Sequence, residues 1–98
     1  MTMHQPSHPG EILEELVIEP LELSLTDVAQ YLNVSRKTLF RIVNAKSAIS
    51  PEMAVRLELV FQKPTAEHWL QLQNAYDLWN AKQQQSELHI QPYSFEYA

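Results

Sequence analysis

The sequence predicts an all-α fold of five helices, on three observations. Apolar side chains recur every three or four residues along most of the chain, which places them on one face of a helix. The 98 residues include a single glycine and few runs of β-branched residues, so a sheet is disfavoured. Ser50 and Thr65 each precede an apolar periodic segment, and their hydroxyls are suited to capping a first helical turn. A chain of this length forms one domain with one modest core.

The helices are expected over about residues 11–18, 51–61 and 66–84, with two shorter ones within 25–44. Pro20 ends the first helix, because proline lacks the N–H group that continues the hydrogen-bond ladder. The predicted buried face of this first helix comprises Ile12, Leu13, Leu16 and Val17.

The two ends of the chain lie outside the predicted core. Residues 1–7 are polar and contain Pro6, which predicts a flexible arm ahead of a domain spanning 8–85. In the tail, residues 86–98, apolar residues nearly alternate with polar ones as in a strand, although Pro92 confines any strand to a sheet edge. The tail is therefore expected to be short and irregular or strand-like. Three arrangements stay open: a disordered end, a strand paired with a partner chain, or a segment folded over its own domain.

The most specific spacing lies in residues 25–44. The expected inward-facing residues of its two short helices are Val28, Ala29, Leu32, Leu39, Ile42 and Val43. Asn33 lies where the chain must turn through a left-handed conformation, which asparagine tolerates. Ser35 is placed to cap the second helix. Together these positions indicate a helix-turn-helix, a motif whose second helix enters a DNA groove.

Charge is distributed unevenly along the chain. The net charge of −5 by itself disfavours a nucleic-acid binder. From Val28 to Pro51, however, all four charged residues are basic, so this window carries +4 and the remainder −9. A single-sign patch on one element is typical of a surface that faces phosphates. The alternative is an ordinary solvated helix face, but the patch coincides with the predicted recognition helix.

Eight polar residues of the motif and the loop after it are candidate DNA contacts. They are Thr26, Ser35, Arg36, Lys37, Thr38, Arg41, Asn44 and Lys46. Arg36, Lys37 and Arg41 are the expected base readers, because guanidinium matches the guanine edge and lysine reaches a base or a phosphate.

The other candidates have weaker or backbone roles. Thr26 and Ser35 lie near helix N-termini, where hydroxyl and backbone N–H groups bind phosphates. Thr38 is a weak contact, and Lys46 is expected to reach the DNA backbone from the loop. Phe40 has two open interpretations: it touches a thymine methyl group, or it covers the adjoining helix.

The last helix carries a continuous apolar seam. Trp69, Leu72, Tyr76 and Trp79 are spaced three, four and three residues apart. This seam either packs on the chain's own core, as aromatic residues at helical spacing usually do, or contributes to the interface of a homodimer. A two-fold dimer would suit paired DNA half-sites.

Other classes of protein are disfavoured. The chain has no cysteine, no apolar N-terminal segment typical of a signal peptide, and no apolar run of the ~20 residues that a membrane helix needs. His4 and His8 are four apart but lack a third metal ligand, and His68 and His89 have no nucleophile partner. We therefore expect a cytoplasmic protein that is not an enzyme, has no metal, cofactor or small-molecule substrate, and does not bind a membrane.

Four blocks of the sequence, in this order and spacing, resemble one known family. They are HPGEIL at 8–13, VSRKTLFRIVN at 34–44, ISPEMAVRLELVF at 49–61 and WLQLQNAYDLW at 69–79. The chain resembles the Xre/Cro-repressor-like helix-turn-helix family, and more narrowly a HigA-type antitoxin, from about residue 8 to 82. Two positions depart from the family pattern: Asn33 stands where glycine is common, and Asn44-Ala45 where Asn-Gly is frequent.

The resemblance implies a lambda-repressor-like five-helix domain with a long C-terminal helix. It also implies a homodimer that represses its own operon at a palindromic double-stranded DNA operator, and that binds and neutralises a HigB-type toxin, a small basic ribonuclease that cleaves mRNA. The acidic remainder of the chain fits a basic partner. Two alternatives stay open: a free-standing repressor without a toxin, and a protein-interaction module that has lost DNA binding.

Overall fold

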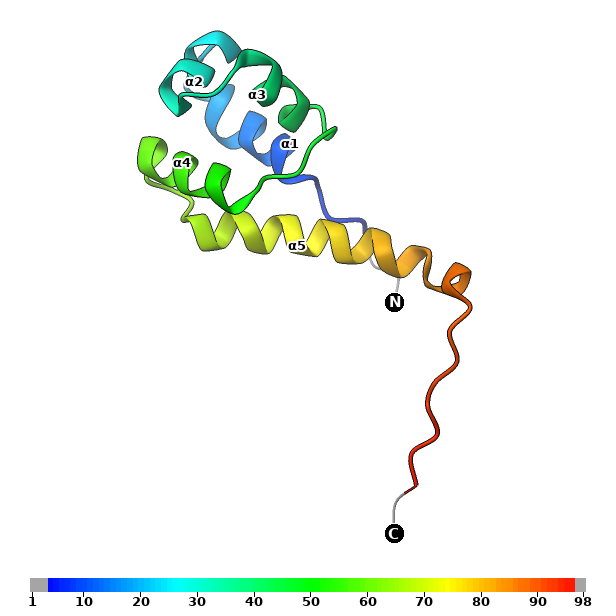
Figure 1. The fold of residues 1–98 in the computed structure, drawn as a ribbon. Helices are drawn as coiled ribbons and strands as arrows, with labels where there is room; N and C mark the ends of the chain where they lie inside the picture. The colour runs from blue at the N-terminus through cyan, green and yellow to red at the C-terminus, as the bar shows by residue number, and fades with distance from the viewer. Residues whose placement is uncertain (1–3, 97–98) are drawn as a thin grey trace.

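The computed structural model describes residues 4–96, and within that range the protein is all-α, as predicted. Four helices gather into one bundle, and a long fifth helix runs across one side of it (Figure 1). The helices are α1 Pro9–Leu13 continuing as the π-helix η1 Glu14–Ile18, α2 Leu25–Leu32, α3 Arg36–Val43, α4 Pro51–Phe61 and α5 Ala66–Gln83. A 3-10 turn, η2 Gln85–Leu88, follows α5. No helix in this range is both long and apolar enough to cross a membrane.

Three of the predicted helix starts are confirmed by their capping bonds. The hydroxyl oxygen of Ser35 accepts from the Thr38 backbone N–H at 3.0 Å, and that of Ser50 from Met53 at 3.1 Å. Thr65 accepts from His68 at 3.2 Å. Each bond satisfies a backbone N–H that has no partner within its own helix, so local hydrogen bonding fixes where these helices begin.

The first helix differs from the prediction in its second half. From Glu14 to Ile18 it is a π-helix, in which each N–H bonds one residue further back than in an α-helix. The wider turn rotates Val17 and Ile18 into the core and leaves Leu16 64% exposed. The prediction that Leu16 is buried is therefore wrong, because it assumed α-helical spacing throughout.

The single glycine lies where α1 meets α3. A Cβ atom built on Gly10 would come within 1.8 Å of the carbonyl oxygen of Ile42. Only a residue without a side chain allows the two backbones to approach this closely. His8 caps the same helix, because its Nδ1 accepts from the Gly10 backbone N–H at 2.9 Å. The segment His8–Gly10 therefore docks the N-terminal helix onto the second helix of the motif.

The core is formed by apolar residues from all five helices and from the loop before α4. Its largest fully buried side chains include Trp69, Leu13, Leu32, Leu39, Ile49 and Leu57. Trp69 is 1% exposed, so it packs within its own chain and has almost no surface to offer a second copy. Its assignment to a dimer interface is corrected on this ground.

The rest of the predicted seam is also used partly within the chain. Leu72 packs against the core, and the ring of Tyr76 meets His8 edge-on with centroids 4.8 Å apart. Trp79 is half-buried. Within the described N-terminal arm, the Gln5 amide donates to Asn80 at 3.3 Å, so residues 4–8 follow α5.

The tail leaves the bundle after η2 and extends away from it (Figure 1). From residue 89 to 96 it forms no regular element, and its apolar side chains Leu88, Ile90, Tyr93 and Phe95 are exposed. The strand-like alternative is not adopted over this range. Residues 1–3 of the predicted arm and 97–98 of the predicted tail lie outside the described residues.

Candidate nucleic-acid interface

Helices α2 and α3 form the predicted helix-turn-helix, and the turn between them is built as the sequence predicts. Asn33 has φ 55° and ψ 47°, a left-handed conformation that ends α2. Ala29 is 3% exposed and Val28 is fully buried, so a small side chain lies where the two helices press together. This geometry presents the outer face of α3 to solvent.

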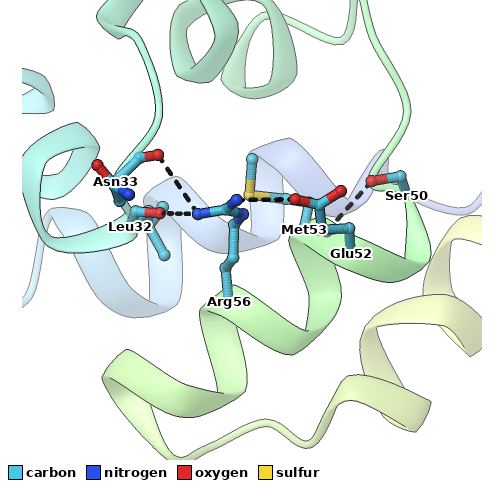
Figure 2. A network of polar contacts seen from close by, with 6 residues as sticks. All are labelled: Leu32, Asn33, Ser50, Glu52, Met53 and Arg56. Carbon is cyan, nitrogen blue, oxygen red and sulfur yellow. Dashed lines mark hydrogen bonds and ion pairs between the residues drawn. The ribbon is translucent and has the colours of Figure 1, made fainter.

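A residue that the sequence analysis passed over, Arg56 of α4, stabilises the end of α2. Its Nη1 donates to the carbonyl oxygen of Leu32 at 2.8 Å and to that of Asn33 at 3.3 Å, while Nη2 pairs with Glu52 at 2.7 Å (Figure 2). A cation at a helix C-terminus satisfies orphan carbonyl groups and opposes the negative end of the helix dipole. The turn of the motif is thus held from outside the motif.

Replacing Arg56 by methionine is expected to lower the free energy of unfolding by about 1–2 kcal/mol, because it removes two charge-assisted hydrogen bonds to carbonyl groups as well as the ion pair to Glu52, and keeps the apolar stem. Chemical denaturation measures the change. The matched control is Glu52→Gln, which removes only the ion pair to a largely exposed carboxylate and should cost about 0.5 kcal/mol or less. Equal losses in the two variants would contradict the proposed support of α2 by Arg56.

The exposed face of α3 carries a small open hollow. Arg36, Lys37 and Phe40 line it, and its volume is about 340 Å³. Both cations lie in the first turn of the helix, at the end that approaches base edges in this motif. The structure therefore brings together two of the three predicted base readers.

The third predicted base reader, Arg41, is engaged in its own chain. Its Nε donates to the hydroxyl oxygen of Ser47 at 3.0 Å and its Nη2 to the carbonyl oxygen of Lys46 at 3.3 Å. These bonds close the loop that follows α3, in which Ala45 takes a left-handed conformation with φ 58°. Arg41 therefore stabilises this loop, and its predicted role as a base reader stays a prediction.

Three other candidates, Ser35, Thr38 and Asn44, also have partners within the motif. The Ser35 hydroxyl donates to Thr38 Oγ1 at 2.8 Å, and the Asn44 amide donates to the carbonyl oxygen of Phe40 at 2.8 Å. Thr26 lies exposed in the first turn of α2, whose cap is Ser24, and Lys46 is exposed in the loop after α3.

The loop after α3 is tied to the body of the protein by side chains that the sequence analysis did not assign. The Ile49 backbone N–H donates to Oε1 of the buried Gln73 at 2.8 Å, and Gln73 in turn donates to Asp77 at 2.9 Å. The Ser47 backbone also interacts with the His8 imidazole and favours its protonated form. Because these partners are far apart in sequence, no local pattern identifies them.

Burial lowers the pKa of His8 below its usual 6.5, against the opposing effects of the Glu11 and Asp77 carboxylates and the Ser47 backbone. Nδ1 accepts the Gly10 N–H, so the folded state holds the neutral imidazole. The unfolded chain, with the ordinary pKa, binds more protons as the pH falls below about 7. The contribution of His8 to stability is therefore full well above pH 6.5, where the imidazole is neutral in both states, and declines as the pH falls through 6.5 toward its lowered folded pKa.

The measurement is the free energy of unfolding in urea at pH 7.5 and at pH 5.5. His8→Asn keeps a capping oxygen and does not titrate, so its stability should fall less between the two pH values than that of the wild type. His4, His68 and His89 are unchanged in this variant. An identical pH dependence in the two proteins would show that His8 is not the group responsible.

A comparison with known proteins agrees with this geometry. A family model described as Helix-turn-helix matches residues 13–68. An HTH-type transcriptional regulator of Haemophilus influenzae is 46% identical over 96 residues, covering 94% of this chain and 89% of that protein. The chain therefore belongs to the helix-turn-helix family of Xre-like proteins.

Two solved structures narrow the resemblance. The antitoxin GraA superposes with a TM-score of 0.85 at 34% identity, covering 93% of this chain and all of that one. The Pseudomonas aeruginosa antitoxin HigA, solved with the higBA promoter, superposes with a TM-score of 0.77 at 37% identity, covering 89% and 97%. The chain is a homologue of HigA-type antitoxins, and the resemblance inferred from its four sequence blocks is confirmed.

Proposed function

We propose that this protein is the antitoxin of a type II toxin–antitoxin module and an autorepressor that binds the operator upstream of its own gene as a dimer. The observation that carries the DNA-binding half is the pair Arg36 and Lys37, exposed in the first turn of α3. A solved relative with the same fold, the Pseudomonas aeruginosa antitoxin HigA, was solved with the higBA promoter. Basic side chains at this position reach base edges and phosphates in the major groove.

The toxin-binding half of the proposal is supported by charge. Residues 1–35 contain six acidic residues and neither lysine nor arginine. The acidic side chains Glu11, Glu14, Glu15, Glu19, Glu22 and Asp27 are all exposed. Such a surface attracts a basic protein and steers its approach. This is the electrostatic complement expected for a small basic ribonuclease of the HigB type.

Fluorescence anisotropy with the duplex upstream of the gene, a scrambled duplex and a salt series tests the DNA-binding half. Three or four cations per subunit on phosphates should give a log–log salt slope of roughly −5 to −7 for a dimer. Sequence-preferring, salt-steep binding supports the autorepressor. No binding at low salt would reject it and favour a protein-interaction module.

Co-expression with the product of the adjacent reading frame tests the toxin-binding half. The antitoxin should restore growth that the toxin arrests and should elute with it as a complex in size-exclusion chromatography. DNA binding without growth rescue or complex formation would favour a free-standing repressor. Sedimentation of the antitoxin alone measures the dimer, to which the half-exposed Leu78 and the half-buried Trp79 of α5 are candidate contributors.

A further inference from the structure

Phe40 is an aromatic residue in an unusual position. It lies one turn after Arg36 and Lys37 on the outer face of α3, and its side chain is 51% exposed. It is absent from the core and from the partly buried residues that pack against the core. Packing against an adjoining helix therefore does not explain why about half of the Phe40 surface is exposed to solvent.

Most of the polar side chains around Phe40 form hydrogen bonds within the chain. Thr38 bonds Ser35, Asn44 bonds the Phe40 backbone, and Arg41 bonds the loop after α3. The hollow is lined instead by Arg36, Lys37 and Phe40. This end of α3 thus combines two cations with one apolar surface.

The major groove offers one apolar group for such a surface, the 5-methyl group of thymine. We propose that Phe40 is a specificity-determining residue that contacts a thymine methyl beside the base or phosphate bound by Arg36 or Lys37. This inference rests on the DNA-binding half of the proposed function. If Phe40 makes this contact, the protein prefers thymine at one defined position of each half-site.

The test replaces thymine by deoxyuridine, which removes only the methyl group and keeps every hydrogen-bonding group. The probe is a duplex that the wild-type protein selects from a random pool, with each thymine replaced in turn, symmetrically in both half-sites. At the contacted position the wild type should lose about fourfold in affinity per half-site, the value of one buried methyl group of about 0.8 kcal/mol. Phe40→Ala should bind the thymine and deoxyuridine duplexes equally at that position.

The matched control is Tyr31→Ala, which removes another half-exposed aromatic residue, located on α2. It should retain the wild-type deoxyuridine pattern. A thermal melt of Phe40→Ala close to that of the wild type shows that the fold is retained, as expected for a ring outside the core. If the wild type selects a site but its deoxyuridine scan is flat, or if Phe40→Ala keeps the same sensitive position, the inference is wrong while the proposed function stands. If the wild type selects no sequence, the DNA-binding half of the proposed function itself fails.

Discussion

Replacing Gly10 by alanine is expected to lower the free energy of unfolding by about 3 kcal/mol, at the upper end of what overpacking usually costs. In an ordinary helix the same change is favourable by roughly 0.5–1 kcal/mol, because alanine has the better helix propensity. Here the new methyl group would lie 1.8 Å from the Ile42 carbonyl oxygen and 2.6 Å from its carbon. Both are backbone atoms, so neither can rotate away.

Relief requires α1 to move off α3, which would loosen the packing around Leu13 and Ile42, both almost fully buried. Urea denaturation measures the loss. Glu11→Ala is the matched control, because it changes the next residue of the same helix at an exposed position and should cost only a few tenths of a kcal/mol. A Gly10→Ala protein as stable as the wild type would show that α1 and α3 do not approach this closely.

The features that the sequence predicts correctly are those determined by neighbouring residues. The caps at Ser35, Ser50 and Thr65 and the left-handed turn at Asn33 depend on hydrogen bonds and backbone sterics within four residues. Helix α4 spans Pro51–Phe61 as predicted, because a cap and a proline fix its start. Local chemistry is sufficient for these elements.

The features that the sequence does not predict depend on distant partners. Arg56 bonds carbonyl groups 23 and 24 residues away, and Gln73 bonds an N–H group 24 residues away. Arg41 is five or six residues from its partners, but its role depends on how the loop folds. The π-helix moves Leu16 from the predicted buried face to the surface, and residues 14–18 contain no proline or glycine from which this change could be predicted. For Trp69, periodicity identifies an apolar face but not whether that face meets its own core or a second copy.

The same distinction separates the candidate DNA contacts. A helical wheel places Lys37 and Arg41 together on one face, with Arg36 beside Lys37 in the first turn, and the sequence makes all three candidate base readers. In the structure the Arg41 guanidinium holds Ser47 and the Lys46 carbonyl, whereas Arg36 lines the open hollow of α3. The two arginines should therefore differ in what their loss does to binding.

Arg36→Ala is expected to weaken operator binding by about 1–3 kcal/mol per half-site, the discrimination of one bidentate base contact, and to leave binding to scrambled DNA much less affected. In a two-fold dimer both half-sites lose the contact, so the affinity should fall by roughly 30-fold or more. Arg41→Ala should act on the loop, with a smaller loss that is similar on operator and scrambled duplexes.

Anisotropy titrations of both variants, each on operator and scrambled duplexes, separate these roles. Lys82→Ala serves as the control, since it removes an exposed cation at the far end of α5 and should leave both affinities unchanged. If Arg41→Ala instead abolished the preference for the operator while Arg36→Ala lost affinity equally on both duplexes, the assignments would be reversed. Arg41 would then read a base either with its remaining guanidinium N–H groups or by exchanging the loop bonds of its Nε and Nη2 for a base on binding. The comparison of the two arginines therefore tests whether the recognition surface is formed before DNA arrives.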